Sequence, residues 1–201
     1  MHVFITGTDT NVGKTTISSW ICLHTGYDYF KPIQSGAVEG LDSNIVRSIS
    51  NVKIHQEKYI YQHPFSPHLA ASLENEEIDT NNIHLPNVKN LIIEGAGGVL
   101  VPLNRNKLII DLIKQSGATV ILVARSTIGT INHTLLSLEA LRARNIPILG
   151  VIVNGLPNKD NNEAIEFYGK VKILAIVPQL KEVTRASLIQ VDCSYLKKFL
   201  N

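Results

Sequence analysis

The chain has 201 residues, of which 44% are hydrophobic, and its formal net charge is +2. This balance and the scattered basic residues disfavour nucleic acid as a partner, and no apolar run approaches the roughly 20 residues of a membrane-spanning helix. A strand is predicted from residue 2, which leaves no room for a signal peptide. We therefore expect one cytoplasmic domain, residues 1–201, with its two cysteines reduced.

Short apolar runs alternate with longer amphipathic segments along the chain. Strands are predicted at residues 2–6, 28–31, 90–94, 119–124, 147–153 and 172–177, and helices at 14–24, 42–50, 107–116, 131–144, 160–168 and 187–200. Several strands are apolar on both faces, as in parallel strands covered by helices on each side. The pattern predicts an α/β fold with a doubly wound, mainly parallel sheet, whose ligands bind at the carboxyl ends of the strands. Residues 52–88, rich in proline and polar residues, are expected to form an irregular excursion.

The first predicted strand leads into the glycine-rich segment TGTDTNVGKTT, residues 6–16. Gly7 and Gly13 let the backbone curl so that its N–H groups face an anion, while Lys14 suits the β- and γ-phosphates and Thr15 suits Mg²⁺. The usual pattern has its first glycine one position later, where this chain has Thr8. A strand before and a helix after the segment favour a phosphate-binding loop over a turn that binds nothing. We therefore expect a single-domain fold like that of the P-loop NTPases.

The segment KPIQSG, residues 31–36, follows the second predicted strand. Lys31 at a strand end could hold the charge of a transferring phosphoryl group, or it could be a surface lysine. Ser35 could contact a substrate or simply occupy a turn. The residues alone leave both alternatives open.

Two carboxylates are candidates for a metal site. Asp42 begins a predicted helix, where it could act as a capping residue or reach Mg²⁺. Glu94 ends the apolar run LIIE and precedes the turn GAGG, the position at which P-loop proteins carry a second acidic group for Mg²⁺. Because a buried carboxylate without a partner is costly, Glu94 is expected to have a cation beside it.

Two further segments follow later strands. The amide of Asn154 could read a purine edge, although Asn154-Gly155 also fits a plain turn. The segment GTINH, residues 129–133, begins the longest predicted helix, and its free N–H groups would suit a carboxylate or an ordinary helix start. The seven histidines show no spacing typical of zinc, and no Ser/His/Asp arrangement stands out.

Six motifs together closely resemble the dethiobiotin synthetase family. They are GTDTNVGKT (7–15), KPIQSG (31–36), SPH (66–68), EGAGGVLVPL (94–103), GTINH (129–133) and VNG (153–155), and only residues 181–201 lie outside the match. The resemblance implies a homodimeric, ATP- and Mg²⁺-dependent cyclo-ligase of biotin biosynthesis. Such enzymes join CO₂ to 7,8-diaminopelargonic acid through a carbamate and a carbamic–phosphoric anhydride, and release dethiobiotin, ADP and phosphate.

The resemblance also implies a role for each matching residue. Lys31 and Lys14 would be catalytic, and Thr15, Asp42 and Glu94 would bind Mg²⁺. The diamine site would include Thr10 and Ser35, and the substrate carboxylate would lie against Gly129, Thr130, Ile131 and Asn132 of the partner subunit. The nucleotide would be held by Asn11, Val12, Gly13, Lys14, Thr15, Thr16, Asp42, Glu94, Gly95, Ala96, Gly97, Asn154, Gly155, Pro178, Gln179 and Leu180, with Asn154 reading adenine.

Three rival functions fit a phosphate-binding loop. A regulatory ATPase of the partitioning type usually has a second lysine near the first glycine, and no lysine lies between Met1 and Lys14. A cobyrinate-type amide ligase needs a glutamine-hydrolysing domain, for which this chain is too short. A non-catalytic nucleotide-binding module would bind ATP without turnover that depends on the diamine. The partitioning type also gives no reason for KPIQSG, and the synthetase interpretation is favoured over all three.

Overall fold

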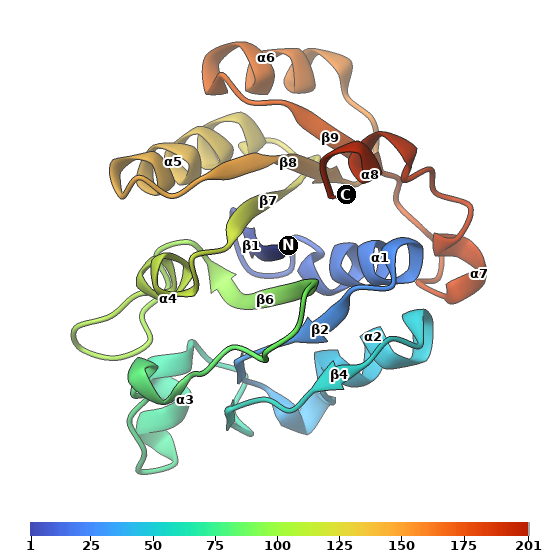
Figure 1. Ribbon diagram of the computed structural model, residues 1–201. Helices are drawn as coiled ribbons and strands as arrows, with labels where there is room; N and C mark the ends of the chain where they lie inside the picture. The colour runs from blue at the N-terminus through green and yellow to red at the C-terminus, as the bar shows by residue number, and fades with distance from the viewer. Residues whose placement is uncertain (201) are drawn as a thin grey trace.

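The computed structural model describes residues 1–200, and a seven-stranded parallel sheet forms its centre (Figure 1). The strand order is β4-β2-β6-β1-β7-β8-β9. The bounds of these strands are β1 His2–Gly7, β2 Asp28–Phe30, β4 Ile54–His55, β6 Leu91–Gly98, β7 Thr119–Arg125, β8 Ile148–Asn154 and β9 Ile173–Val177. The predicted doubly wound α/β fold is confirmed.

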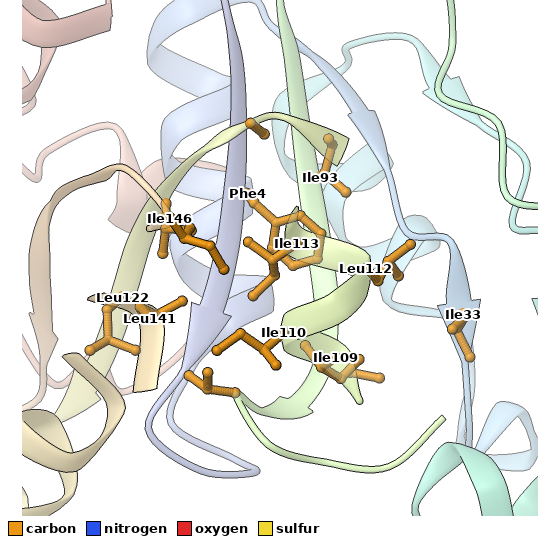
Figure 2. Close-up of a cluster of buried hydrophobic side chains, with 14 of the residues drawn as sticks. Phe4, Ile33, Ile93, Ile109, Ile110, Leu112, Ile113, Leu122, Leu141 and Ile146 are labelled. Carbon is orange, nitrogen blue, oxygen red and sulfur yellow. The ribbon is translucent and has the colours of Figure 1, made fainter. Parts of the chain in front are cut away.

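Helices cover both faces of this sheet. The helices are α1 Lys14–Thr25, α2 Asp42–Ser50, α3 Pro67–Leu73, α4 Ile109–Ser116, α5 Thr130–Ala143, α6 Lys159–Gly169, α7 Arg185–Leu188 and α8 Ser194–Leu200. Successive residues of β1 point to opposite faces, as in any strand. Val3 and Ile5 pack in the core under α1, α2 and α8, whereas Phe4 packs on the other side among Ile93, Ile110 and Ile113 (Figure 2).

The register of the central strands brings the sequence motifs to one edge of the sheet. Ile5 pairs with Glu94 between β1 and β6, and Phe30 pairs with Ile93 between β2 and β6. Lys31 therefore follows β2 beside Glu94 of β6, and β6 in turn lies next to β1 and the loop that follows it. In a parallel sheet all these loops emerge at the carboxyl end, where open α/β folds bind ligands.

The segment 52–88 is more regular than predicted. It contains β4, the short strand β5 (Tyr59–Ile60), α3 and a single 3₁₀ turn at Thr80–Asn82. β5 pairs with β3 (Ile33–Gln34) in a separate two-stranded parallel sheet. These strands are only two residues long, too short for the alternation of apolar and polar residues to reveal them.

The predicted helix 187–200 is wrong as a single element, because the chain forms α7 and α8 with a break between them. The side chain of Asp192 accepts hydrogen bonds from the backbone N–H of Ser194 (3.0 Å) and from its hydroxyl (2.7 Å). An aspartate that binds the backbone two residues ahead favours a turn over a continuing helix.

The C-terminal segment contacts α1 through side-chain hydrogen bonds. Trp20 Nε1 donates to the carbonyl of Val191 at 3.0 Å, and a ring nitrogen of His24 lies 3.3 Å from the carbonyl oxygen of Leu188. Leu196 is fully buried in the core between α8 and the sheet. Within residues 1–200, no helix has the length and apolar character that a membrane crossing requires.

Replacing Leu196 by alanine should lower the free energy of unfolding by about 2–4 kcal/mol, because it leaves a cavity beneath α8. Chemical denaturation measures the change, and Lys198→Ala on the exposed side of the same helix is the matched control. Equal stability of the two variants would show that α8 does not pack on the core in solution.

Candidate active site

The loop between β1 and α1 has the backbone geometry of a phosphate-binding loop. A Cβ atom on Gly7 would lie 2.7 Å from Cγ2 of Val12 and 2.9 Å from the carbonyl oxygen of Asp9, so the curled loop leaves no space for a side chain there. Gly7 thus supplies the first glycine, although it stands one residue earlier than the usual pattern. The N–H of Thr8 donates to the carbonyl of Val123 at 2.9 Å and ties the loop to β7.

Gly13 and Asn154 fix the second half of this loop. Gly13 precedes α1 with φ of 96°, a left-handed conformation that favours glycine. The side-chain amide of Asn154 donates to the carbonyl of Val12 at 3.0 Å, and a Cβ on Gly13 would lie 2.0 Å from that amide nitrogen. Asn154 therefore supports the loop, while its Oδ1 remains the atom that could meet a base. Its predicted contact with adenine stays a prediction.

Lys14 is the first residue of α1 and is 8% exposed. Its Nζ donates to the carbonyl of Asp9 at 3.1 Å across the loop. Burial, assisted by the nearby ammonium of Lys31, lowers the pKa of Lys14 to about 8 against the opposing effect of Glu94. A phosphate group would supply the negative charge that this ammonium lacks.

Lys31 forms the centre of a buried charge cluster. Its Nζ donates to Oδ2 of Asp42 and, at 3.2 Å, to Oε1 of Glu94. Lys31 is 4% exposed and Glu94 is 1% exposed. Burial alone would lower the pKa of Lys31, but the two carboxylates outweigh burial and raise it, so the ammonium stays charged. The surface-lysine alternative for Lys31 is therefore wrong.

Asp42 is the first residue of α2 and does not cap it. The N-cap position is Leu41, and the side chain of Asp42 turns to Lys31 instead. Gln34 assists this arrangement, because its Oε1 accepts the backbone N–H of Asp42 at 3.2 Å. The capping alternative for Asp42 is thus wrong. Both predicted carboxylates, Asp42 and Glu94, accept hydrogen bonds from the ammonium of Lys31.

The oxygen atoms around this cluster fit Mg²⁺. The Thr15 hydroxyl donates to Oε1 of Glu94 at 2.8 Å, so Thr15, Asp42 and Glu94 converge. No three His, Cys, Asp or Glu side chains gather as a metal cluster within residues 1–200. Two carboxylates and a hydroxyl nevertheless suit Mg²⁺, which takes few protein ligands and completes its shell with phosphates and water.

Sequence reasoning missed three parts of the site. The hydroxyl of Tyr29 donates to Oε2 of Glu94 at 3.0 Å, and burial raises the pKa of this phenol well above its ordinary value. Arg125 at the end of β7 forms a 2.6 Å ion pair with Asp9 of the loop. Gln34, described above, is the third. Tyr29 lies beside Phe30 in the short strand β2, where an aromatic residue is normally interpreted as part of the core, so no local signal distinguishes it.

The remaining predicted nucleotide contacts lie on neighbouring loops. Gly95, Ala96 and Gly97 continue β6 beyond Glu94, Gly155 follows β8, and Pro178, Gln179 and Leu180 follow β9 at the same end of the sheet. A Cβ on Gly97 would lie 3.5 Å from Oγ1 of Thr10, so the carboxyl end of β6 adjoins the phosphate loop. Asn11 and Thr16 belong to the loop and α1. The structure brings these segments to one edge, and their contacts with a nucleotide stay predictions.

The predicted substrate residues occupy two places. The hydroxyl of Ser35 is buried without a hydrogen-bond partner, close in sequence to the Lys31 cluster. Gly129 to Asn132 instead line an open pocket of about 680 Å³ at the start of α5, together with Ile128, Leu135, Asn158 and Asn161. The Thr130 hydroxyl in this pocket is also buried and unpaired. Among the described residues, no member of the Lys31 cluster lines this pocket.

This fold and this loop define a P-loop nucleotide-binding protein. Solved structures of similar fold include the cell division ATPase MinD of Pyrococcus furiosus, 13% identical over 98% of each chain with a TM-score of 0.59. A ParA family ATPase from Chlorobium tepidum is also 13% identical, covering 98% of this chain and 90% of that one with a TM-score of 0.51. At such low identity these structures show the fold alone.

Sequence comparison gives the family. A family model described as an AAA domain matches residues 1–187. The ATP-dependent dethiobiotin synthetase BioD of Lawsonia intracellularis is 57% identical over 94% of this chain and 93% of its own length. The synthetase of the same name from Paramagnetospirillum magneticum is 45% identical over 92% of both chains. The chain belongs to the dethiobiotin synthetase family, as its six motifs predicted.

Gly13→Ala should weaken ADP binding at least tenfold, because the new Cβ would strike the amide of Asn154 and distort the loop. Gly26→Ala is the matched control, since Gly26 ends the same helix with φ of 73° and has open space around its Cβ position. Calorimetric titration with ADP measures both variants. Equal affinity in the two would mean that the Gly13–Asn154 contact does not shape the loop.

Binding of ADP should also take up protons above pH 8. In the free protein the pKa of Lys14 is about 8, so above that pH its amine is largely neutral, and phosphate oxygens favour the charged form. The affinity should therefore fall as the pH rises from about 8 to 10. Titrations at pH 9 in buffers of different ionisation enthalpy measure the uptake. Uptake that persists in Lys14→Arg, whose guanidinium stays charged, would assign it to another group.

Proposed function

We propose that this chain is an ATP-dependent ligase that joins CO₂ to 7,8-diaminopelargonic acid and closes the ring of dethiobiotin, a step of biotin biosynthesis. Membership of the dethiobiotin synthetase family supports this activity. The observation that carries it is Lys31, a second buried lysine held by Asp42 and Glu94 beside the phosphate loop. A protein that only bound nucleotide would have no use for such a lysine.

In the proposed reaction the phosphate loop holds ATP. The backbone N–H groups at the start of α1 and the ammonium of Lys14 face the β- and γ-phosphates. Thr15, Asp42 and Glu94 are the residues that would hold Mg²⁺, which would neutralise phosphate charge during transfer. The positive charge of Lys14, left without a carboxylate partner of its own, is then matched by a phosphate.

Lys31 would act on the carbamate that forms from CO₂ and on the phosphoryl group that is transferred to it. One amine of the substrate captures CO₂ as a carbamate, and a carbamate oxygen attacks the γ-phosphate to form a mixed carbamic–phosphoric anhydride. Both the carbamate and the transferring phosphoryl group carry negative charge, which a fixed ammonium stabilises. The second amine then attacks the carbonyl carbon, closes the ring and expels phosphate.

The substrate would span two subunits of a homodimer. Thr10 and Ser35 lie near the loop and the Lys31 cluster, where the two amines must be. The pocket at Gly129 to Asn132 lies at the start of α5, where the backbone N–H groups of Ile131 and Asn132 have no intrahelical acceptor and would suit a carboxylate. In the proposed dimer, a partner subunit would place this pocket at the far end of the substrate, as the family resemblance implies. We further propose that residues 1–201 act as one domain in the cytoplasm.

Phosphate release from ATP, Mg²⁺ and ¹³C-bicarbonate, with and without 7,8-diaminopelargonate, tests the activity. The proposal predicts release that requires the diamine and a product that contains one ¹³C carbonyl. Release that ignores the diamine would favour the partitioning-type regulatory ATPase, and ATP binding without release would favour a binding module.

Lys31→Ala should lower kcat for phosphate release by about a hundredfold or more, since its charge acts mainly on the transition state. Lys159→Ala on the exposed surface of α6 is the control. The affinity for ADP, measured separately, should change much less than kcat. Near-normal kcat in Lys31→Ala would contradict the role assigned to this lysine.

A further inference from the structure

The two oxygens of Glu94 have different surroundings. Oε1 accepts the hydroxyl of Thr15 at 2.8 Å and the ammonium of Lys31 at 3.2 Å. Oε2 accepts the hydroxyl of Tyr29 at 3.0 Å. Thr15 and Lys31, which take part in the proposed reaction, thus both bind Oε1, whereas Oε2 is bound by the core residue Tyr29.

The fold fixes Tyr29 in this position. Tyr29 pairs with Ile92 between β2 and β6, so Glu94, two residues further along β6, points to the same face of the sheet. The Tyr29 side chain is fully buried in the core under α1, together with Trp20 and Ile21. A ring packed on all sides keeps its hydroxyl at one place, and that place faces Glu94.

We propose that Tyr29 is a positioning residue, whose hydroxyl sets the rotation of the Glu94 carboxylate so that Oε1 faces Thr15, Lys31 and the divalent cation. This inference rests on the proposed function for the presence of Mg²⁺, and on the structure for the contact. The terminal torsion of a glutamate is broad, so a carboxylate held at only one oxygen can turn. Tyr29 holds the second oxygen and removes this freedom.

Removal of the Tyr29 hydroxyl would leave Oε2 buried without a donor. The carboxylate would then gain by turning Oε2 toward Lys31 or Thr15, and the oxygen presented to a cation would no longer be fixed. Partners that orient a metal ligand typically change metal affinity by about 10- to 100-fold when they are lost. Such a loss should appear in metal binding itself, and not only in turnover.

Tyr29→Phe tests the proposal, with Tyr27→Phe as the matched control. Tyr27 is buried in the same core, and its hydroxyl donates to the carbonyl of Leu200, away from Glu94. Mn²⁺ is titrated into each protein saturated with ADP, and the free ion is followed by its electron paramagnetic resonance signal. We expect Tyr29→Phe to bind Mn²⁺ about tenfold more weakly, while Tyr27→Phe binds it like the unmodified protein.

Two further measurements separate positioning from packing. The affinity for ADP without a divalent cation should be the same in both variants. In the background of Glu94→Gln, which removes the carboxylate, Tyr29→Phe should cause little further loss of Mn²⁺ affinity, because the two changes act on one interaction. If Tyr29→Phe fails to fold, 4-methylphenylalanine at position 29 fills the space without a donor and should give the same tenfold loss.

Unchanged Mn²⁺ affinity in Tyr29→Phe would overturn the proposal, and so would an equal loss in Tyr27→Phe. A full additional loss in the Glu94→Gln background would also overturn it, because Tyr29 would then act through another group. Failure of the proposed function is distinguishable, since it would appear as absent diamine-dependent phosphate release in the unmodified protein while the Mn²⁺ titrations still differ.

Discussion

The buried ammonium of Lys31 is the constraint on which the rest of the site depends. Removing a charge from water costs several kcal/mol unless partners compensate for it, and removing one partner of a buried pair is strongly destabilising. Asp42 and Glu94 are those partners. With Lys14, these three residues form a group of two positive and two negative side chains. The end of β2, which Lys31 follows, the helix that begins at Asp42 and the strand that carries Glu94 must therefore meet at one point.

This balance also prepares the site for its ligands. Without a nucleotide, Lys31 satisfies both carboxylates, and Lys14 has only the carbonyl of Asp9. A phosphate would give Lys14 its missing partner, and a divalent cation at the carboxylates would free Lys31 to face new negative charge. The protein would then stabilise developing charge with groups that are already in place, which is usually the largest single contribution to enzyme catalysis.

The sequence was sufficient to predict those parts of the site that lie directly after a predicted strand. The apolar run before Glu94 indicates a buried strand, and the glycines around Lys14 indicate a phosphate-binding loop. The sheet and the loop could therefore be predicted. The family, and the metal-binding role predicted for Asp42, were inferred from the combination of motifs, because Asp42 alone resembled a cap. Tyr29 could not be predicted, since its partner on the next strand depends on register, and the break before α8 depends on one side-chain contact of Asp192.

Transfer of an oxygen atom from CO₂ to phosphate tests the central claim, that this site phosphorylates a carbamate, most directly. The diamine and Mg²⁺-ATP are mixed with the protein and ¹⁸O-labelled bicarbonate, and the reaction is quenched before the label exchanges with water. If a carbamate oxygen attacks the γ-phosphate and the second amine then expels phosphate, each phosphate released carries one ¹⁸O atom. Phosphate without the label, formed together with the ring, would contradict the account.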